Sequence, residues 1–119
     1  LLTVVHEQFL TDTARFADYV LPATTQLEHF DLMWSWGHAC LSLNRPAIAP
    51  LGESVPTTEF FRRLASRLGL TASYLQTCDT TLIQEALQSE HPWLAGITWE
   101  RLQAECSDTV RLSCYCGHG

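Results

Sequence analysis

The chain of 119 residues contains no lysine, and its seven arginines are outnumbered by thirteen acidic residues. The net charge of −6 argues against a nucleic-acid partner, because a surface that follows phosphates needs clustered positive charge. No apolar run approaches the length of a membrane span, so no span is expected. Glycine-rich phosphate loops of the G-x-G-x-x-G and G-x-x-x-x-G-K forms are also missing, which excludes a self-contained Rossmann or kinase-like site.

The sequence also lacks an even, regularly spaced set of cysteines. Its five cysteines are typical of free thiols in a reducing compartment rather than of a closed disulfide framework. Near the end, Cys114, Cys116 and His118 form C-x-C-x-H, a pattern that could hold a soft metal ion. A fourth ligand is missing nearby, so we assign no metal ligand. A small Cys/His metal-binding protein remains an alternative.

What is present begins with an ordered change of character over the first 29 residues, from apolar strand to polar loop, helix and second apolar strand. The short, β-branched start predicts a buried strand whose carboxyl end carries His6 and Glu7. Thr11 is expected to cap the helix, and Pro22, which has no N–H, to close the second strand. Ligands in open α/β sheets bind at such strand ends, so this order predicts a nucleotide-sized crevice.

Residues 30–43 show no clear period, and we interpret them as a long loop or lid. Packing is the favoured role for Trp34 and Trp36, and His38 is assigned a structural role. The three prolines of residues 44–56 then predict an extended connector across the surface.

An amphipathic helix is predicted after the connector, with Thr57 or Thr58 as its cap and Gly69 at its end. Four large apolar residues lie on one side of this helix, namely Phe60, Phe61, Leu64 and Leu68.

Two shorter helices are predicted farther along, one capped by Asp79 or Thr80 and one begun by Thr98. We expect both helices to be peripheral. The length suits one compact domain. Within it we distinguish an α/β segment over residues 1–70 from peripheral helices and a divergent tail over residues 71–119. Because the chain starts without methionine and inside an apolar segment, we interpret it as a piece of a longer polypeptide or a processed product.

The residues from Val4 to Glu28 follow the pattern V-V-x-D/E-x-F-x-T-x-T-A-x-x-A-D-x-V-L-P-A-x-x-x-x-E, and in this the chain resembles the molybdopterin oxidoreductase family, of the dimethyl sulfoxide reductase and formate dehydrogenase type. The similarity continues through EHFDLMWSWGH, NRPAIAPLGES and TEFFRRLASRLGL and fades after Thr71. It implies an α/β fold with a partial doubly wound, mainly parallel sheet and flanking helices, as a fragment of a larger multidomain enzyme.

The resemblance places four residues at positions that approach the cofactor. Glu7 matches the acidic contact position, where a carboxylate can accept hydrogen bonds from a ribose diol or the N–H edge of guanine. His6 matches the neighbouring contact position. His29 stands where relatives often have lysine, and Thr57 where they usually have aspartate or asparagine. A solvated loop carboxylate for Glu7 and simple capping for Thr57 are the alternatives.

Thr11 and Thr13 complete the predicted cofactor-binding set. Their hydroxyls lie at a helix start, where free N–H donors can hold an anionic group with little positive charge required. Helix capping accounts for both residues equally well.

The resemblance therefore implies part of a molybdenum or tungsten oxidoreductase that helps bind molybdopterin guanine dinucleotide. No residue matches the metal-ligating position of such enzymes, so we assign no catalytic residue and expect the isolated chain to be inactive and to bind no cofactor. The expected partners are the remaining domains of the parent enzyme. Its compartment, cytoplasmic or periplasmic, and its substrate stay open.

The second alternative is a non-catalytic interaction module that keeps the fold. Such a module could associate with itself through an exposed strand edge, because unpaired N–H and C=O groups there can pair with another chain.

Overall fold

The computed structural model describes residues 1–34, 40–104 and 110–111. Its contacts divide the chain into two compact units. The first comprises Leu1–His29 with Arg45–Thr77, and the second comprises Phe30–Asn44 with Cys78–Gly119. These units do not coincide with the predicted division at residue 70, whose two segments remain a prediction.

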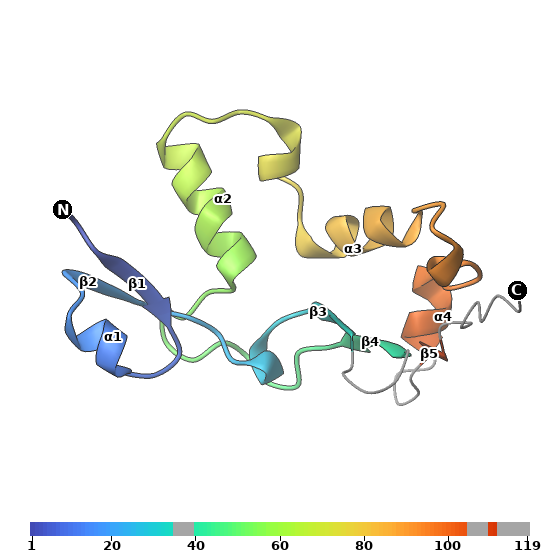
Figure 1. The fold of residues 1–119 in the computed structure, drawn as a ribbon, viewed down its shortest axis with the longest axis horizontal. Coiled ribbons are helices and arrows are strands. Elements are labelled where there is room, and N and C mark those ends of the chain that lie inside the picture. The colour runs from blue at the N-terminus through green and yellow to red at the C-terminus, as the bar shows by residue number, and fades with distance from the viewer. Residues whose placement is uncertain (35–39, 105–109, 112–119) are drawn as a thin grey trace, which may run out of the picture. The chain divides into compact units, whose positions relative to one another are not determined.

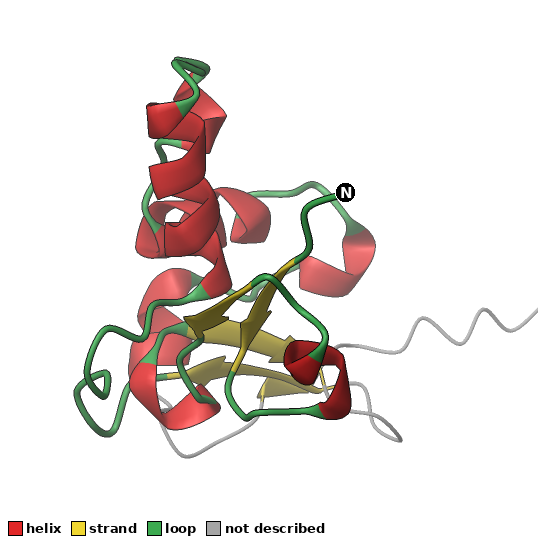
Figure 2. Cartoon of the chain, turned by 90° about the vertical axis from the view of Figure 1, so that its left-hand side faces the viewer, coloured by secondary structure: helices red, strands yellow, loops and turns green. Residues whose placement is uncertain are grey.

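The first unit contains a parallel strand pair, β1 (Val4–Glu7) and β2 (Tyr19–Pro22), joined through α1 (Asp12–Arg15). Figure 1 shows α1 beside the two strands, and Figure 2 shows the strands in yellow from another side. The register pairs Val5 with Val20 and Glu7 with Pro22. The predicted order of strand, helix and strand is thus confirmed, and both carboxyl ends lie at one edge.

A third extended segment joins the same edge. Ala23 and Val55 form a parallel bridge, in which the Thr24 N–H donates to the Val55 carbonyl over 3.2 Å. The Val55 N–H donates to the Pro22 carbonyl over the same distance, 3.2 Å. Because proline has no N–H, Pro22 contributes to the pairing through its carbonyl alone, at the end of the strand as predicted.

Helix α2 (Thr57–Arg67) starts immediately after this segment. Its N-cap is Pro56, which makes no side-chain capping bond, so the prediction of a Thr57 or Thr58 cap is wrong. The extended backbone of Pro56 already turns the chain into the helix, and Thr57 is the first helical residue. The predicted end is confirmed. Gly69 has φ +72°, and the Leu70 N–H donates to the Ala65 carbonyl over 2.9 Å in a Schellman arrangement.

Two short 3₁₀ helices complete the first unit, η1 (Gln26–Glu28) and η2 (Ser73–Leu75). Only small or polar residues are buried here, namely Ala14, Thr24, Glu28 and Ala65. On α2, Phe61, Leu64 and Leu68 are exposed. The apolar side predicted for this helix therefore remains largely open to solvent.

The second unit contains an antiparallel sheet in the order β3 (Asp31–Trp34), β4 (Cys40–Asn44) and β5 (Val110–Arg111). The prediction of a long loop over residues 30–43 is therefore wrong for the described part. Leu41 and Leu43 alternate with polar residues, and Leu43 pairs with Leu32, which is the period-2 pattern of a half-buried strand. The α/β class is confirmed, but parallel pairing of the described strands is confined to the first unit.

The described part of the second unit also contains three helical elements, namely α3 (Asp79–Leu87), η3 (Pro92–Leu94) and α4 (Trp99–Ala104). The buried apolar cluster consists of Leu41 with Ile83, Leu87, Ile97 and Leu102, so the helices supply most of the core and are not peripheral. Thr98 begins α4 as predicted, its Oγ1 accepting from the Arg101 N–H over 3.2 Å. Cys78, rather than Asp79 or Thr80, is the N-cap of α3. None of the described helices is long and apolar enough to cross a membrane.

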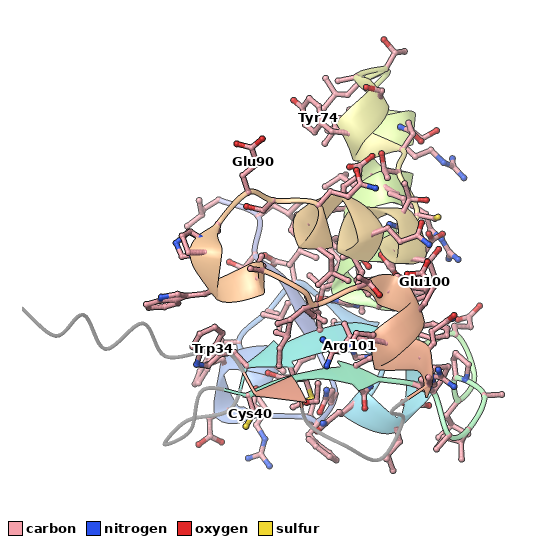
Figure 3. All side chains as sticks on the ribbon, turned by 90° about the vertical axis from the view of Figure 1, so that its right-hand side faces the viewer. Trp34, Cys40, Tyr74, Glu90, Glu100 and Arg101 are labelled. Atoms are coloured by element: carbon pink, nitrogen blue, oxygen red, sulfur yellow. The ribbon has the colours of Figure 1, made fainter. Side chains whose placement is uncertain are left out.

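Trp34 is half exposed, and its ring lies 5.9 Å from that of Trp93 in the same unit. Figure 3 shows Trp34 at the surface of the sheet. The favoured packing role thus holds for one face of Trp34. Trp36 and His38 lie outside the described residues.

Candidate functional site

The carboxyl edge of the parallel segments borders a pocket of about 400 Å³. All of its lining residues belong to the first unit. Most are apolar, namely Phe9, Pro22, Ala23, Ile48, Ala49 and Leu51, and four are polar, namely Gln8, Thr25, Glu28 and Ser54. Open α/β sheets bind ligands at this kind of edge, so the pocket lies where the sequence predicts the crevice.

Two neighbouring side chains at the end of β1 differ in what they contact. Gln8 Nε2 donates to the Thr24 carbonyl over 2.9 Å, which ties the ends of β1 and β2 together. Glu7 Oε1 accepts from the Gln8 backbone N–H over 2.8 Å. The other carboxylate oxygen of Glu7 makes no hydrogen bond with the described residues. It is therefore available to accept from a ligand.

His6 is held by a ring contact but leaves one polar atom unsatisfied. Its imidazole stacks on Phe60 of α2, with centroids 4.9 Å apart and planes 21° apart. Its Nε2 is buried and has no hydrogen-bond partner among the described residues, and the same is true of Ser54 Oγ. A buried polar atom without a partner costs about 1–3 kcal/mol. A bound polar group would remove that cost.

Glu28 fastens one wall of the pocket. Its Oε2 accepts from the Thr25 N–H and hydroxyl over 2.6 and 2.8 Å, and its Oε1 accepts from the Leu51 N–H over 2.7 Å. Hydrogen bonds from Thr25 and then Leu51 hold the pKa of the Glu28 carboxyl below its usual range. A charged Glu28 therefore joins the end of β2 to the connector.

A second attachment lies beside Glu28. The Leu27 carbonyl accepts from the Ala47 and Ile48 N–H groups over 2.8 and 3.1 Å. Sequence reasoning did not assign Glu28 to the site, although it is the last residue of the family pattern. The missed signal was a glutamate three residues after Thr25, which is the spacing of a capping box.

The other predicted residues occupy different surroundings. His29 Nδ1 lies 2.9 Å from the Oγ1 of buried Thr24. Thr57 is exposed at the start of α2. Thr11 Oγ1 accepts from the Ala14 N–H over 3.3 Å, which confirms its capping role, and Thr13 is exposed within α1. The structure thus gathers His6 and Glu7 at the end of one strand, with Thr57 following the third parallel segment.

Metal-binding side chains do not gather in the described part of the chain, where no group of three His, Cys, Asp or Glu residues could hold an ion. The C-x-C-x-H residues Cys114, Cys116 and His118 lie outside that part.

Cys78 has the surroundings of a reactive thiol. It is exposed at the N-terminus of α3, with its Sγ 3.2 Å from Thr80 Oγ1 and 3.1 Å from Thr81 Oγ1. These hydrogen bonds and the Thr81 backbone N–H lower the pKa of the Cys78 thiol to about 7. Only the thiolate is nucleophilic, so a lowered pKa raises reactivity at neutral pH.

We expect the alkylation rate of Cys78 by iodoacetamide to be half-maximal near pH 7, whereas an ordinary thiol needs about pH 8.5. The rate is measured by peptide mass spectrometry, which separates Cys78 from the other cysteines. Replacing Thr80 and Thr81 with alanine is expected to move the midpoint upward. An unchanged midpoint in that double variant would show that the hydroxyls do not stabilise the thiolate.

Comparison with known proteins decides the family. Residues 2–67, more than half of the chain, match the family model described as Molybdopterin oxidoreductase. The chain belongs to the molybdopterin oxidoreductase family. It is 45% identical over 103 residues to "Probable oxidoreductase YoaE" of Bacillus subtilis (strain 168), covering 86% of this chain and 15% of that protein. It is 35% identical over 100 residues to "Putative formate dehydrogenase SH0748" of Staphylococcus haemolyticus (strain JCSC1435), covering 84% of this chain and 10% of that protein.

A solved structure is also similar. Acetylene hydratase from Pelobacter acetylenicus matches with a TM-score of 0.64 and 31% identity, over 87% of this chain and 14% of that chain. The chain thus spans roughly a tenth to a seventh of the relatives it matches.

Membership of the molybdopterin oxidoreductase family implies a molybdenum or tungsten pterin cofactor in the complete enzyme. The residues at the carboxyl edge fit such a group. The unsatisfied His6 Nε2 and the second oxygen of Glu7 offer hydrogen-bonding atoms. The neighbouring pocket, whose lining includes neither of these two residues, offers apolar walls.

Proposed function

We propose that this chain is a segment of a molybdenum or tungsten oxidoreductase and contributes to the binding of molybdopterin guanine dinucleotide. The observation that carries the proposal is the convergence of three parallel segments, ending at Glu7, Ala23 and Val55, on one edge beside a pocket of about 400 Å³.

The proposed contacts use atoms that the protein leaves available. The second Glu7 oxygen accepts hydrogen bonds from a ribose diol or from the N–H edge of guanine. His6 Nε2, buried beside the start of α2, bonds a further polar group, and Thr57 lies on the neighbouring segment. His29, whose Nδ1 lies 2.9 Å from Thr24 Oγ1, is kept as a proposed contact through its position near the end of β2.

Thr11 and Thr13 also remain predicted contacts. The Thr11 hydroxyl is already engaged in capping, and α1 has four residues. We therefore place Thr11 and Thr13 at the periphery of the proposed cofactor site.

When bound, the cofactor supplies two-electron chemistry through its metal and dithiolene groups. The residues of this chain bind and orient it, and we propose no catalytic residue among them. The segment alone is proposed to be inactive, because the relatives are several times longer.

The test is the Glu7→Ala substitution in the complete enzyme. Losing a charged acceptor is expected to weaken cofactor retention by about tenfold or more. Molybdenum and tungsten are counted by mass spectrometry after dialysis, and the guanine nucleotide released by acid is counted by chromatography.

The matched control is Glu90→Ala, which removes an exposed carboxylate that extends away from the second unit (Figure 3). This control is expected to keep wild-type metal and nucleotide content. Wild-type metal and nucleotide content in the Glu7→Ala enzyme would contradict the proposed role of Glu7.

One observation favours the interaction module as a second candidate. Among the described strands β1 pairs with β2 alone, and Val4 on it is exposed. Such an edge can pair with another copy of the chain. A mass that rises with protein concentration, together with absent guanine nucleotide, would support this candidate.

A further inference from the structure

A second pocket of about 330 Å³ lies along α2 and η2, on residues that the proposed cofactor site does not use. Its lining consists of Glu59, Arg62, Arg63, Ser66 and Arg67 with Gln76. Three of the chain's seven arginines therefore meet in one place. With one carboxylate among them, the lining carries a formal charge of +2 in a chain of net charge −6.

The three guanidinium groups differ in how many of their nitrogens already donate hydrogen bonds within the protein. Arg62 is fixed, because its Nε donates to Glu59 over 3.0 Å and its Nη1 to the Thr77 carbonyl over 2.9 Å. Arg63 donates to Glu59 through Nε alone, over 2.7 Å, which leaves its two terminal nitrogens available. Arg67 makes no ion pair or hydrogen bond with the described residues.

Glu59 compensates only part of this positive charge. Hydrogen bonds from Arg63 and then Arg62 lower the pKa of the Glu59 carboxyl, which stays ionised as the partner of both. Arg67 lies four residues after Arg63, where like charges on a helix repel each other. The helix dipole favours a cation in the last turn, which accounts for Arg67 but not for two arginines that share one carboxylate a turn earlier.

We propose that this pocket, termed the arginine pocket, binds a phosphate group. A tetrahedral dianion matches the +2 charge of the lining, and its oxygens can accept paired N–H donors from Arg63 and Arg67. The Ser66 hydroxyl and the Gln76 amide lie in the same lining and can donate to the remaining oxygens. Arg62 and Arg63 both donate to Glu59 in the same lining.

The experiment titrates inorganic phosphate into the complete protein at low ionic strength and follows the heat of binding. The double variant Arg63→Ala/Arg67→Ala is expected to lose one phosphate site per chain, seen as at least tenfold weaker binding. Glu59→Gln adds one unit of net positive charge and is expected to tighten binding by about threefold. The matched control is Arg15→Ala, which removes an exposed arginine of α1 and is expected to keep the wild-type stoichiometry.

A parallel titration with glycerol 1-phosphate distinguishes the source of the phosphate group. Tighter binding of this ester than of inorganic phosphate would assign the arginine pocket to a phosphorylated metabolite, and equal or weaker binding would assign it to free phosphate. An unchanged number of phosphate sites in the Arg63→Ala/Arg67→Ala variant would overturn the proposal, as would an equal loss in the Arg15→Ala control.

Discussion

Replacing Glu28 with alanine is expected to detach the connector of residues 44–56 from the end of β2 and to open the pocket wall. Three hydrogen bonds to the carboxylate disappear at once, two from Thr25 and one from Leu51. Ile48 and Leu51 are exposed, so a freed connector offers apolar cleavage sites. Thermolysin is expected to cut there about tenfold faster, because proteolysis follows the population of locally open forms.

The control for this prediction is Glu53→Ala, which removes an exposed carboxylate from the same connector. Cleavage in this control is expected to stay at the wild-type rate. The structural role of Glu28 would be refuted if both variants were cut equally fast.

The same hydrogen bonds predict an acid response. Folding lowers the pKa of Glu28. The stability that ionised Glu28 contributes is therefore fully present above the pKa of the unfolded chain, about 4.3, and is lost as the pH falls through the pKa of the folded chain. We expect the connector to open more often below about pH 4.3. The measurement is the hydrogen-exchange rate of the Leu51 backbone amide, which should rise in this range. A Glu28→Gln variant is expected to be open already at pH 7 and to lose this dependence.

Replacing Leu102 with alanine is expected to destabilise the second unit by about 2–5 kcal/mol, the usual range for truncating a buried leucine. Leu102 is 3% exposed and belongs to a cluster of five buried apolar residues in the described part of the unit, so little material there is available to fill the cavity. The measurement is denaturant unfolding followed by tryptophan fluorescence. All four tryptophans of the chain fall within the ranges of this unit, so the signal reports on it alone.

Glu85→Ala is the matched control, because Glu85 is an exposed residue of α3 in the same unit. Its effect is expected to stay within about 0.5 kcal/mol. Equal unfolding midpoints for the two variants would show that the cluster around Leu102 does not stabilise the unit.

The first unit could be predicted well because its signals are local. Alternation of apolar and polar segments, the Thr11 cap, the ending at Pro22 and the glycine at 69 each act within a few residues. Parallel pairing then follows from the strand, helix and strand order. The position of the crevice at the end of β1 could therefore be predicted without coordinates.

The missed features depend on partners far apart in the sequence. Glu28 finds its third donor at Leu51, and His6 finds Phe60, so no local pattern reveals either contact. The β3 and β4 strands were missed because two tryptophans and a methionine obscured the alternation of Leu41 and Leu43. The cap of α2 was misjudged because Pro56 starts the helix through its backbone rather than through a side-chain acceptor.

The pairing of the Leu27 carbonyl with Ala47 and Ile48 brings together the points where the chain leaves the first unit and returns to it. Residues 30–44 therefore form an inserted segment, and the residues just before and just after it are hydrogen-bonded to each other. A change of length in that segment would therefore leave the groups that line the strand ends in place.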